Sequence, residues 1–403
     1  MSEYIFRGVK NKDEQHWAND LMAKVHSRDY FESQRWIDSF GMGYPGFEME
    51  HTRIAMTRQE IIGALRLTTD TIRIGEARLR MGGFGYVTTA GAHRHKGVSR
   101  DMIRDTLHYM YMNNYHASML FGIPNFYHKY GFATSIGEYA TYIDTSEAEA
   151  IDPPDYTLRQ GKPGDIRAIQ KMHDANDTRT ACSLIRNAAH ISNRWEQWKS
   201  LKVIQDAQGK VCGYFVPRVE DYVLQVDEVG VLDAMDHGAL LYACAAEARQ
   251  YSLSRICFNA PPDFPFIRYL LQFESTQEAK FQRNTGGMLA FINLAEAMES
   301  MIPEWESLLL KSPLHEHRCE ITLWVNKQPI RIRANMGAVD VAATPGKNKI
   351  SLNAMELIHL VTGYRYSEDI LDACHRIIDA PGRLLFETLF PKRNPYVWKL
   401  DRF

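Results

Sequence analysis

The chain reads Gly85-Tyr86-Val87-Thr88-Thr89-Ala90 and then Arg94-His95-Lys96-Gly97-Val98-Ser99-Arg100, a β-prone run that passes through a basic turn. The residues after the turn place Val98, Met102, Ile103, Leu107 and Met110 at helical spacing. The first N–H groups of a helix have no intrahelical partner and see the positive end of its dipole, so they bind anions. Arg94, Lys96 and Arg100 add charge, and Gly97 leaves room for close approach. The sequence therefore predicts a strand–turn–helix unit that suits a diphosphate, although basic residues beside one glycine at such a joint are also common on protein surfaces.

Strands and helices surround this turn in alternating order. We expect strands near Thr52–Met56, Ile61–Thr69, Phe84–Ala90 and Ala117–Phe121, and a short helix near Asn125–Tyr130. The same order returns later, with strands at Val211–Val216, Tyr222–Val231 and Arg255–Asn259 and helices at Ala239–Tyr251 and Phe264–Phe273. The two parts read as a degenerate tandem repeat of one α/β unit.

Composition changes mark the expected domain limits. The acidic segment Thr145–Asp155 contains two prolines and reads as a linker, and Lys311-Ser312-Pro313 marks a second change. After it we expect strands at Glu320–Val325, Ile330–Ala334 and Val339–Ala343, then helices at Asn353–Thr362 and Ser367–Ile377. The prediction is three parts, 1–150, 151–300 and 301–403, of which the last is a small α+β domain.

Overall composition excludes several classes of protein. The 403 residues have a net charge of -2, which gives no global field for nucleic acid or an anionic membrane. The six cysteines form no closely spaced pairs, which indicates reduced thiols. We see no signal peptide and no run of 18 apolar residues. We therefore expect a cytoplasmic protein without a membrane span.

Two motifs resemble a known superfamily. Arg94-x-x-Gly97-x-Ser99 resembles the pyrophosphate turn of the GCN5-related N-acetyltransferase superfamily, and the segment from Asn125 to Phe132 resembles its Phe-Tyr-x-x-x-Gly-Phe signature after the fifth strand. The runs 287–294 and 389–396 and the closing Phe403 resemble the enhanced intracellular survival family. That resemblance implies tandem acetyltransferase folds, a sterol-carrier-protein-like C-terminal domain and a homo-oligomer, specifically a hexamer.

The resemblance also implies roles for individual residues. Acetyl-CoA would be the co-substrate, with no metal, and a small-molecule primary amine such as an aminoglycoside or another polyamine-like compound would be the acceptor. Tyr127 would be the general acid, and the terminal carboxylate of Phe403 the general base. Contacts to the cofactor would come from Val87, Thr88, Thr89, His95, Lys96, Gly97, Val98, Ser99, Arg100, Gly122 and Ile123.

These roles are chemically sensible. An amine attacks a thioester, and the departing thiolate needs a proton. Ordinary pKa values of about 10 for tyrosine and about 8.5 for a thiol make that transfer uphill by about 2 kcal/mol. A terminal carboxylate is ionised at neutral pH and can accept the proton of the amine. The last eight residues include Tyr396, Val397, Trp398 and Leu400, so we expect the tail to be buried.

Other parts of the sequence are less informative. Around Val231–Ala239 the second part carries Asp233 and Asp236 instead of basic residues, so we expect it to be structural. His315, His317 and Cys319 alternate as metal ligands could, but they lack a fourth partner, and we interpret them as polar surface residues. Tyr130 is an alternative acid one turn after Tyr127.

The acceptor and the function class stay open at this point. Acidic and aromatic residues that suit a cation lie in the expected acceptor-side helices, namely Asp29, Phe31, Glu32, Trp36, Asp38 and Phe40. A solvated amphipathic helix explains them equally well. One alternative is a carrier of lipid or another apolar ligand with a non-catalytic acetyltransferase scaffold, and another is a protein lysine acetyltransferase.

Overall fold

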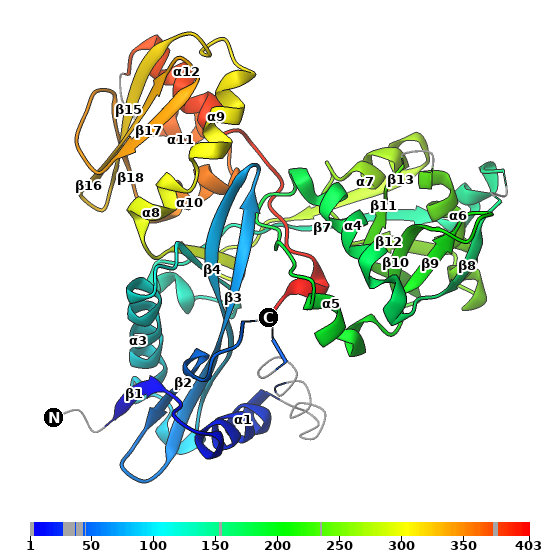
Figure 1. Ribbon diagram of the computed structural model, residues 1–403, viewed down its shortest axis with the longest axis horizontal. Coiled ribbons are helices and arrows are strands. Elements are labelled where there is room, and N and C mark those ends of the chain that lie inside the picture. The colour runs from blue at the N-terminus through cyan, green and yellow to red at the C-terminus, as the bar shows by residue number, and fades with distance from the viewer. Residues whose placement is uncertain are drawn as a thin grey trace.

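The computed structural model describes residues 4–26, 37, 43–44, 46–152, 155–233, 236–373 and 378–403. Its strands form two seven-stranded sheets and one four-stranded sheet, each covered by helices (Figure 1). This confirms the predicted mixed α/β class. None of the helices in the described part of the chain has the length and apolar character needed to span a bilayer.

The first unit is the sheet β1-β2-β3-β4-β5-β14-β6 with its helices. Helices α1 and α3 cover opposite faces, because α1 packs with Ile54 and Ala64 while α3 packs with Ala55 and Leu65. The elements up to β6 are β1 (Ile5–Gly8), α1 (Lys12–His26), β2 (Thr52–Met56), β3 (Ile61–Ile74), β4 (Ala77–Thr89), α3 (Val98–Met112), β5 (Ala117–Gly122), the 3-10 helix η3 (Tyr127–Tyr130) and β6 (Ala133–Thr134).

The second unit repeats this architecture with the sheet β13-β7-β12-β11-β10-β9-β8. Its elements are β7 (Glu138–Asp144), β8 (Thr157–Gln160), α4 (Ile166–Asn176), α5 (His190–Asn193), β9 (Lys202–Gln205), β10 (Val211–Glu220), β11 (Val223–Val231), α6 (Asp236–Gln250), β12 (Arg255–Phe258), α7 (Pro265–Tyr269) and β13 (Ser275–Lys280). When the strand order of the second sheet is reversed and aligned with that of the first, β11 and β12 correspond to β4 and β5, and α6 corresponds to α3.

The two units exchange strands. β14 (Gly286–Phe291) follows the second unit in sequence but pairs with β5 and β6 in the first sheet. β7 comes before residue 150 and pairs with β12 and β13 in the second sheet. No cut near residue 150 separates the two sheets, because the first sheet contains β14 from after that point and the second contains β7 from before it.

The third domain is the four-stranded sheet β17-β16-β15-β18 with its helices. Its elements are α8 (Leu294–Glu299), α9 (Ile302–Leu310), β15 (Arg318–Val325), β16 (Gln328–Asn335), β17 (Ala338–Ala342), β18 (Lys349–Leu352), α10 (Ala354–Thr362), α11 (Ser367–Ala373) and α12 (Ala380–Leu389). The far end of the β3–β4 hairpin reaches this domain (Figure 1). Ile72 and Ile74 pack there with Trp305, and Glu304 accepts a hydrogen bond of 2.7 Å from the N–H of Glu76.

The expected elements around the basic turn are found with small shifts in their ends, and β3 and β4 are longer than predicted. The expected linker is wrong for residues 145–150. That segment forms the 3-10 helix η4 (Thr145–Ala150), because Ala148 is fully buried among residues of the second core, including Leu240 and Leu241 of α6. Helix α12 was not expected; its N-cap Asp379 accepts a hydrogen bond from the N–H of Gly382.

Candidate active site

Strands β4 and β5 separate in the middle of the first sheet. They pair in parallel from Met81–Ala117 to Phe84–Leu120 and then diverge. Just beyond, the register between β3 and β4 shifts, and Tyr86 has a φ of 53°, as in a β-bulge. We call the region where the strands separate the β4–β5 fork. Ala90 donates to the carbonyl of Ile62, so by alternation the backbone of Thr88 faces β3 while that of Thr89 faces the fork.

The basic turn follows the fork directly. His95 and Gly97 both have positive φ, 62° and 83°, and Gly97 caps α3 without a side-chain hydrogen bond. A Cβ on Gly97 would lie 2.8 Å from a guanidinium nitrogen of Arg100, so a side chain there would meet that group. The first N–H groups of α3, on Val98, Ser99 and Arg100, therefore point out of a helix end that no side chain caps.

The side chains of the turn are arranged around these N–H groups. Arg94, His95, Lys96 and Arg100 are exposed. The hydroxyl of Ser99 lies 2.7 Å from that of Thr89, which connects the turn to the end of β4. Arg100 also donates to Asp101, 2.8 Å away, so part of its charge is balanced within the helix. The electropositive helix end and the remaining cations fit a diphosphate.

Tyr127 begins η3, beside the end of β5. Its ring packs edge-on against Phe126 and Phe132, and a Cβ on Gly122 would lie 2.6 Å from it. Burial raises the pKa of Tyr127 to about 12, with a smaller contribution from Tyr130. The hydroxyl therefore keeps its proton throughout the neutral range. The higher pKa makes proton transfer to an ordinary thiolate uphill by about 5 kcal/mol, instead of the about 2 kcal/mol that an ordinary tyrosine would give. A thiolate buried in the same place would itself gain basicity through desolvation.

The chain terminus lies at the same fork. The Phe403 ring packs edge-on to Phe121 of β5, with centroids 6.1 Å apart. A Cβ on Gly83 would be 2.5 Å from that ring, and one on Gly85 would be 3.7 Å from the carboxyl carbon of Phe403. Glycine at position 83 thus makes room for the tail on β4. The terminal carboxylate lies near the first residue of β4 beyond its pairing with β5.

The predicted site residues form two groups in space. Val87, Thr88 and Thr89 on β4 and Gly122 and Ile123 at the end of β5 border the fork, while the turn from His95 to Arg100 lies at the end of β4. Within the first group, the Thr88 hydroxyl donates back to the carbonyl of Tyr86, and the Ile123 side chain is 62% exposed. The expected acceptor-side residues Asp29, Phe31, Glu32, Trp36, Asp38 and Phe40 lie outside the described residues.

His26 lies beside the bulge of β4, although no sequence pattern pointed to it as a residue near the site. It ends α1, its ring lies 5.6 Å from that of Tyr86, edge-on, and it hydrogen-bonds to the backbone of Val87. Burial lowers the pKa of His26, so the imidazole favours its neutral form. A single histidine at the end of a polar helix gives no signal in the sequence, because only the fold brings α1 to the β4 bulge.

The second unit has the same fork without the basic turn. β11 and β12 pair from Leu224–Ile256 to Val226–Phe258 and then separate, and β10 and β11 shift register at the same level. Asp236 opens α6, and its carboxylate accepts a hydrogen bond of 2.6 Å from the hydroxyl of Tyr156. The carboxylate at this helix start is thus already paired within the unit.

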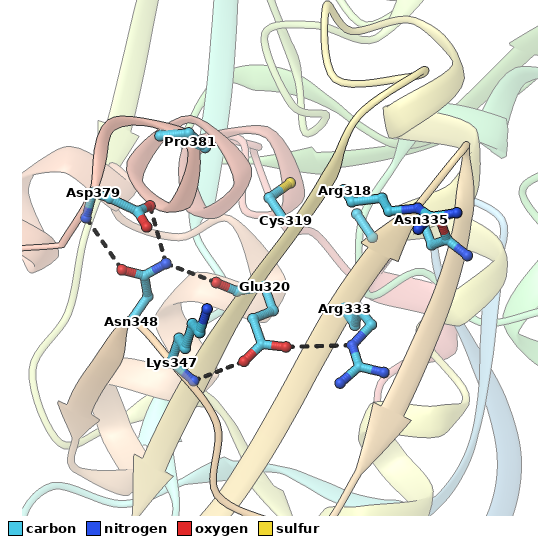
Figure 2. Close-up of a pocket in the computed structure, with 10 residues that line it drawn as sticks. Arg318, Cys319, Glu320, Arg333, Asn335, Lys347, Asn348, Asp379 and Pro381 are labelled. Atoms are coloured by element: carbon cyan, nitrogen blue, oxygen red, sulfur yellow. Dashed lines mark hydrogen bonds and ion pairs between the residues drawn. The ribbon is translucent and has the colours of Figure 1, made fainter.

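The third domain contains a cavity of about 530 Å³ whose lining includes both charged and apolar side chains (Figure 2). Several of its polar groups bond to one another: Glu320 accepts from the backbone of Lys347 at 2.8 Å and from Arg333 at 3.3 Å, and Asn348 donates to Asp379. Within the described residues, no group of three His, Cys, Asp or Glu side chains is placed to hold a metal ion, which includes His315, His317 and Cys319.

A family model matches part of the first unit. Residues 10–135 match the family model described as an acetyltransferase (GNAT) domain. This range contains the fork, the basic turn and Tyr127. No curated protein matches the chain.

Solved structures resemble the chain over its full length. A GCN5-related N-acetyltransferase from Anabaena variabilis is 16% identical with a TM-score of 0.73, covering 99% of this chain and 100% of that one. A probable N-acyltransferase from Enterococcus faecalis is 13% identical with a TM-score of 0.75, covering 99% of both. Eis1 from Mycobacterium abscessus is 13% identical with a TM-score of 0.68, covering 99% and 100%. The chain therefore shares the overall fold of these proteins along nearly its whole length.

Proposed function

We propose that this chain is an acetyl-CoA-dependent N-acetyltransferase that transfers the acetyl group to a primary amine. The observation that carries the proposal is the convergence of three features at the β4–β5 fork of a GNAT domain. These are the uncapped basic helix end, the buried Tyr127 and the terminal carboxylate of Phe403. The match of residues 10–135 to the acetyltransferase domain supports it.

The chain's own groups fit the co-substrate. The N–H groups of Val98, Ser99 and Arg100, with Lys96, would hold the diphosphate, and the backbone of Thr89 and the end of β5 at Gly122 would border the pantetheine arm. Acetyl-CoA supplies a thioester when bound. The Tyr127 hydroxyl holds the proton that the departing thiolate needs, and the Phe403 carboxylate takes the proton of the attacking amine.

The experiment is acetyl-CoA turnover, measured by release of free thiol against a panel of amines that includes aminoglycosides and polyamines. Tyr127→Phe and a variant lacking Phe403 should each lose about 100-fold in kcat, as loss of an acid or base costs. Tyr130→Phe is the matched control, because this neighbour is less buried and should stay within about twofold. If Tyr130→Phe fails and Tyr127→Phe does not, the acid is misassigned.

Two alternatives remain to be separated by the same panel. A lysine acetyltransferase would prefer a protein or peptide amine over every small amine tested. A lipid or apolar-ligand carrier would bind an apolar ligand and no acetyl-CoA. We also propose that the chain belongs to the enhanced intracellular survival family, that its third domain is sterol-carrier-like, and that it forms a hexamer in the cytoplasm. Light scattering can measure the mass of that hexamer.

A further inference from the structure

The last eight residues cross from the second unit to the first. Tyr396 and Trp398 are fully buried in the second unit, and the Tyr396 hydroxyl donates to the carbonyl of Asn259, just after β12. The ammonium group of Lys399 lies 3.3 Å from Asp227 on β11. Segment 396–399 therefore connects β11 and β12 where they separate. In Figure 1 the C-terminus lies between the two units.

Asp401, two residues after Lys399, is held by a buried ion cluster. Its carboxylate accepts two hydrogen bonds from Arg186, at 2.8 and 2.9 Å, and none of the side chain of either residue is exposed. Arg186 donates two more, at 2.7 and 2.6 Å, to Glu228 of β11. Tyr214 of β10 donates to Glu228 at 2.8 Å. One guanidinium thus joins the tail to the central strand of the second sheet.

Histidines complete the cluster. His190 of α5 lies 3.0 Å from Asp401 and 3.0 Å from Arg194, and His173 of α4 lies 3.4 Å from Glu228. The Arg186 guanidinium keeps the pKa of the Asp401 carboxyl well below its usual range despite burial. Arg186 lowers the pKa of the Glu228 carboxyl as well, so both carboxylates are ionised at neutral pH.

A buried cluster of this kind needs a reason beyond stability. The cost of desolvating its ions offsets much of their attraction, and apolar residues of similar size often stabilise a core as well or better. Tyr396 and Trp398 already supply apolar anchoring for the tail. What Arg186 adds is direction, because two bidentate contacts fix the planar guanidinium and both carboxylates in one geometry.

That geometry determines where the chain ends. Only two residues follow Asp401, so the Cα of Phe403 lies within about 7 Å of the Cα of Asp401. Arg402 is tied to Glu138 of β7 at 2.8 Å and stacks on Phe121, and the Phe403 ring packs at Gly83. The carboxylate is thereby directed to Gly85 in the first unit.

We propose that the second unit holds the chain terminus for the first, with Asp401 and Arg186 as positioning residues for the Phe403 carboxylate. This rests on the proposed function, since it assigns the positioned group its role as base. The second unit then acts on the reaction through the position of the chain terminus.

The test compares Asp401→Asn with wild type and a matched control. Asn keeps the shape of the side chain and leaves Arg186 and Glu228 as a balanced pair, so folding should survive. The control is Glu247→Gln, which breaks another buried ion pair of the same unit, Lys202–Glu247 at 2.9 Å, far from the tail in sequence. The two readouts are the rate at which carboxypeptidase A removes Phe403, and kcat and KM for acetyl-CoA.

In Asp401→Asn we expect carboxypeptidase A to remove Phe403 at least tenfold faster than in wild type. We expect kcat to fall 10- to 100-fold, because a misplaced catalytic group costs about that much. KM for acetyl-CoA should stay unchanged. Glu247→Gln should match wild type in both. Unchanged trimming would overturn the proposal. Faster trimming with unchanged kcat would show that the position of the carboxylate does not matter, which also removes Phe403 as base. If wild type acetylates no amine, the proposed function fails, and trimming still decides whether Asp401 holds the tail.

Discussion

The first and second units share one architecture but differ at two places. Both have seven strands in corresponding order, a register shift on the strand before the fork, and a fork where two parallel strands separate. In the first unit the fork leads into a basic turn, and in the second the corresponding helix opens at Asp236. The tail segment 396–399 lies across the second fork, whereas Arg402 and Phe403 reach the first.

The difference shows that the fork alone does not give a site. A bulge and a fork are properties of the backbone, and both units retain them. Anion binding depends on a few side chains at one helix end. Reactivity depends on whether the chain's own tail leaves the fork free for a substrate. We propose that the tail lies at the second fork in the place that the co-substrate takes at the first.

The largest effect should come from breaking the tail's attachment to the second fork. Trp398→Ala removes a large side chain that is 1% exposed, packs on Phe264 and donates to Asp177. We expect a loss of about 3–5 kcal/mol in the free energy of unfolding, measured by urea denaturation. Trp17→Ala is the control, since that ring is 58% exposed and should cost less than about 0.5 kcal/mol. Equal losses in the two variants would mean that Trp398 does not anchor the tail.

Converting the first turn to the character of the second should abolish cofactor binding. The double variant Lys96→Asp, Arg100→Asp places two carboxylates at the helix end, as Asp233 and Asp236 do in the second unit. We expect Kd for acetyl-CoA, measured by calorimetry, to rise at least 100-fold, or about 2.7 kcal/mol. The same changes at exposed Lys10 and Lys12 provide the control for net charge. Equal Kd values would place the diphosphate elsewhere.

A smaller effect should follow from filling the space that the tail uses on β4. In Gly83→Ala the new methyl group would meet the Phe403 ring and the Thr68 hydroxyl, so either the tail or the strand must shift. We expect kcat to fall about tenfold, with Kd for acetyl-CoA nearly unchanged. Gly164→Ala, where nothing lies within 4 Å, should behave as wild type. A Gly83→Ala enzyme with full kcat would show that the ring need not lie there.

The smallest effect concerns pH. Burial lowers the pKa of His190, so the unfolded chain takes up a proton near pH 6.5 that the folded chain does not. The contribution of His190 to the free energy of unfolding is therefore present above that pH and is lost as the pH falls below it. The loss is at most about 1.4 kcal/mol per pH unit. His173, whose pKa is raised, acts in the opposite direction. Between pH 7.5 and 5.5, the free energy of unfolding should therefore change less in His190→Gln than in wild type. A larger change in the variant would contradict the direction assigned to the pKa shift of His190.

The sequence predicted the parts of the fold that local patterns encode. The basic turn, the amphipathic helix after it and the short strands of both units have periodicities and turn residues that local physics explains. Burial of the tail was also predictable, since its aromatic residues are costly to leave in water.

What could not be predicted depends on contacts between distant residues. The exchange of β7 and β14 leaves no local mark, because either strand could complete either sheet. The same holds for Arg186, which meets an aspartate 215 positions away. The raised pKa of Tyr127 likewise follows from burial that only the assembled fold produces.

The most direct test of the central claim changes one charge only. A semisynthetic chain that ends in Phe403 carboxamide keeps every side chain, and it can be compared with wild type in acetyl-CoA turnover on the best amine of the panel. If the terminal carboxylate is the base, kcat should fall about 100-fold while Kd for acetyl-CoA stays the same. A carboxamide chain that turns over as fast as wild type would contradict the account.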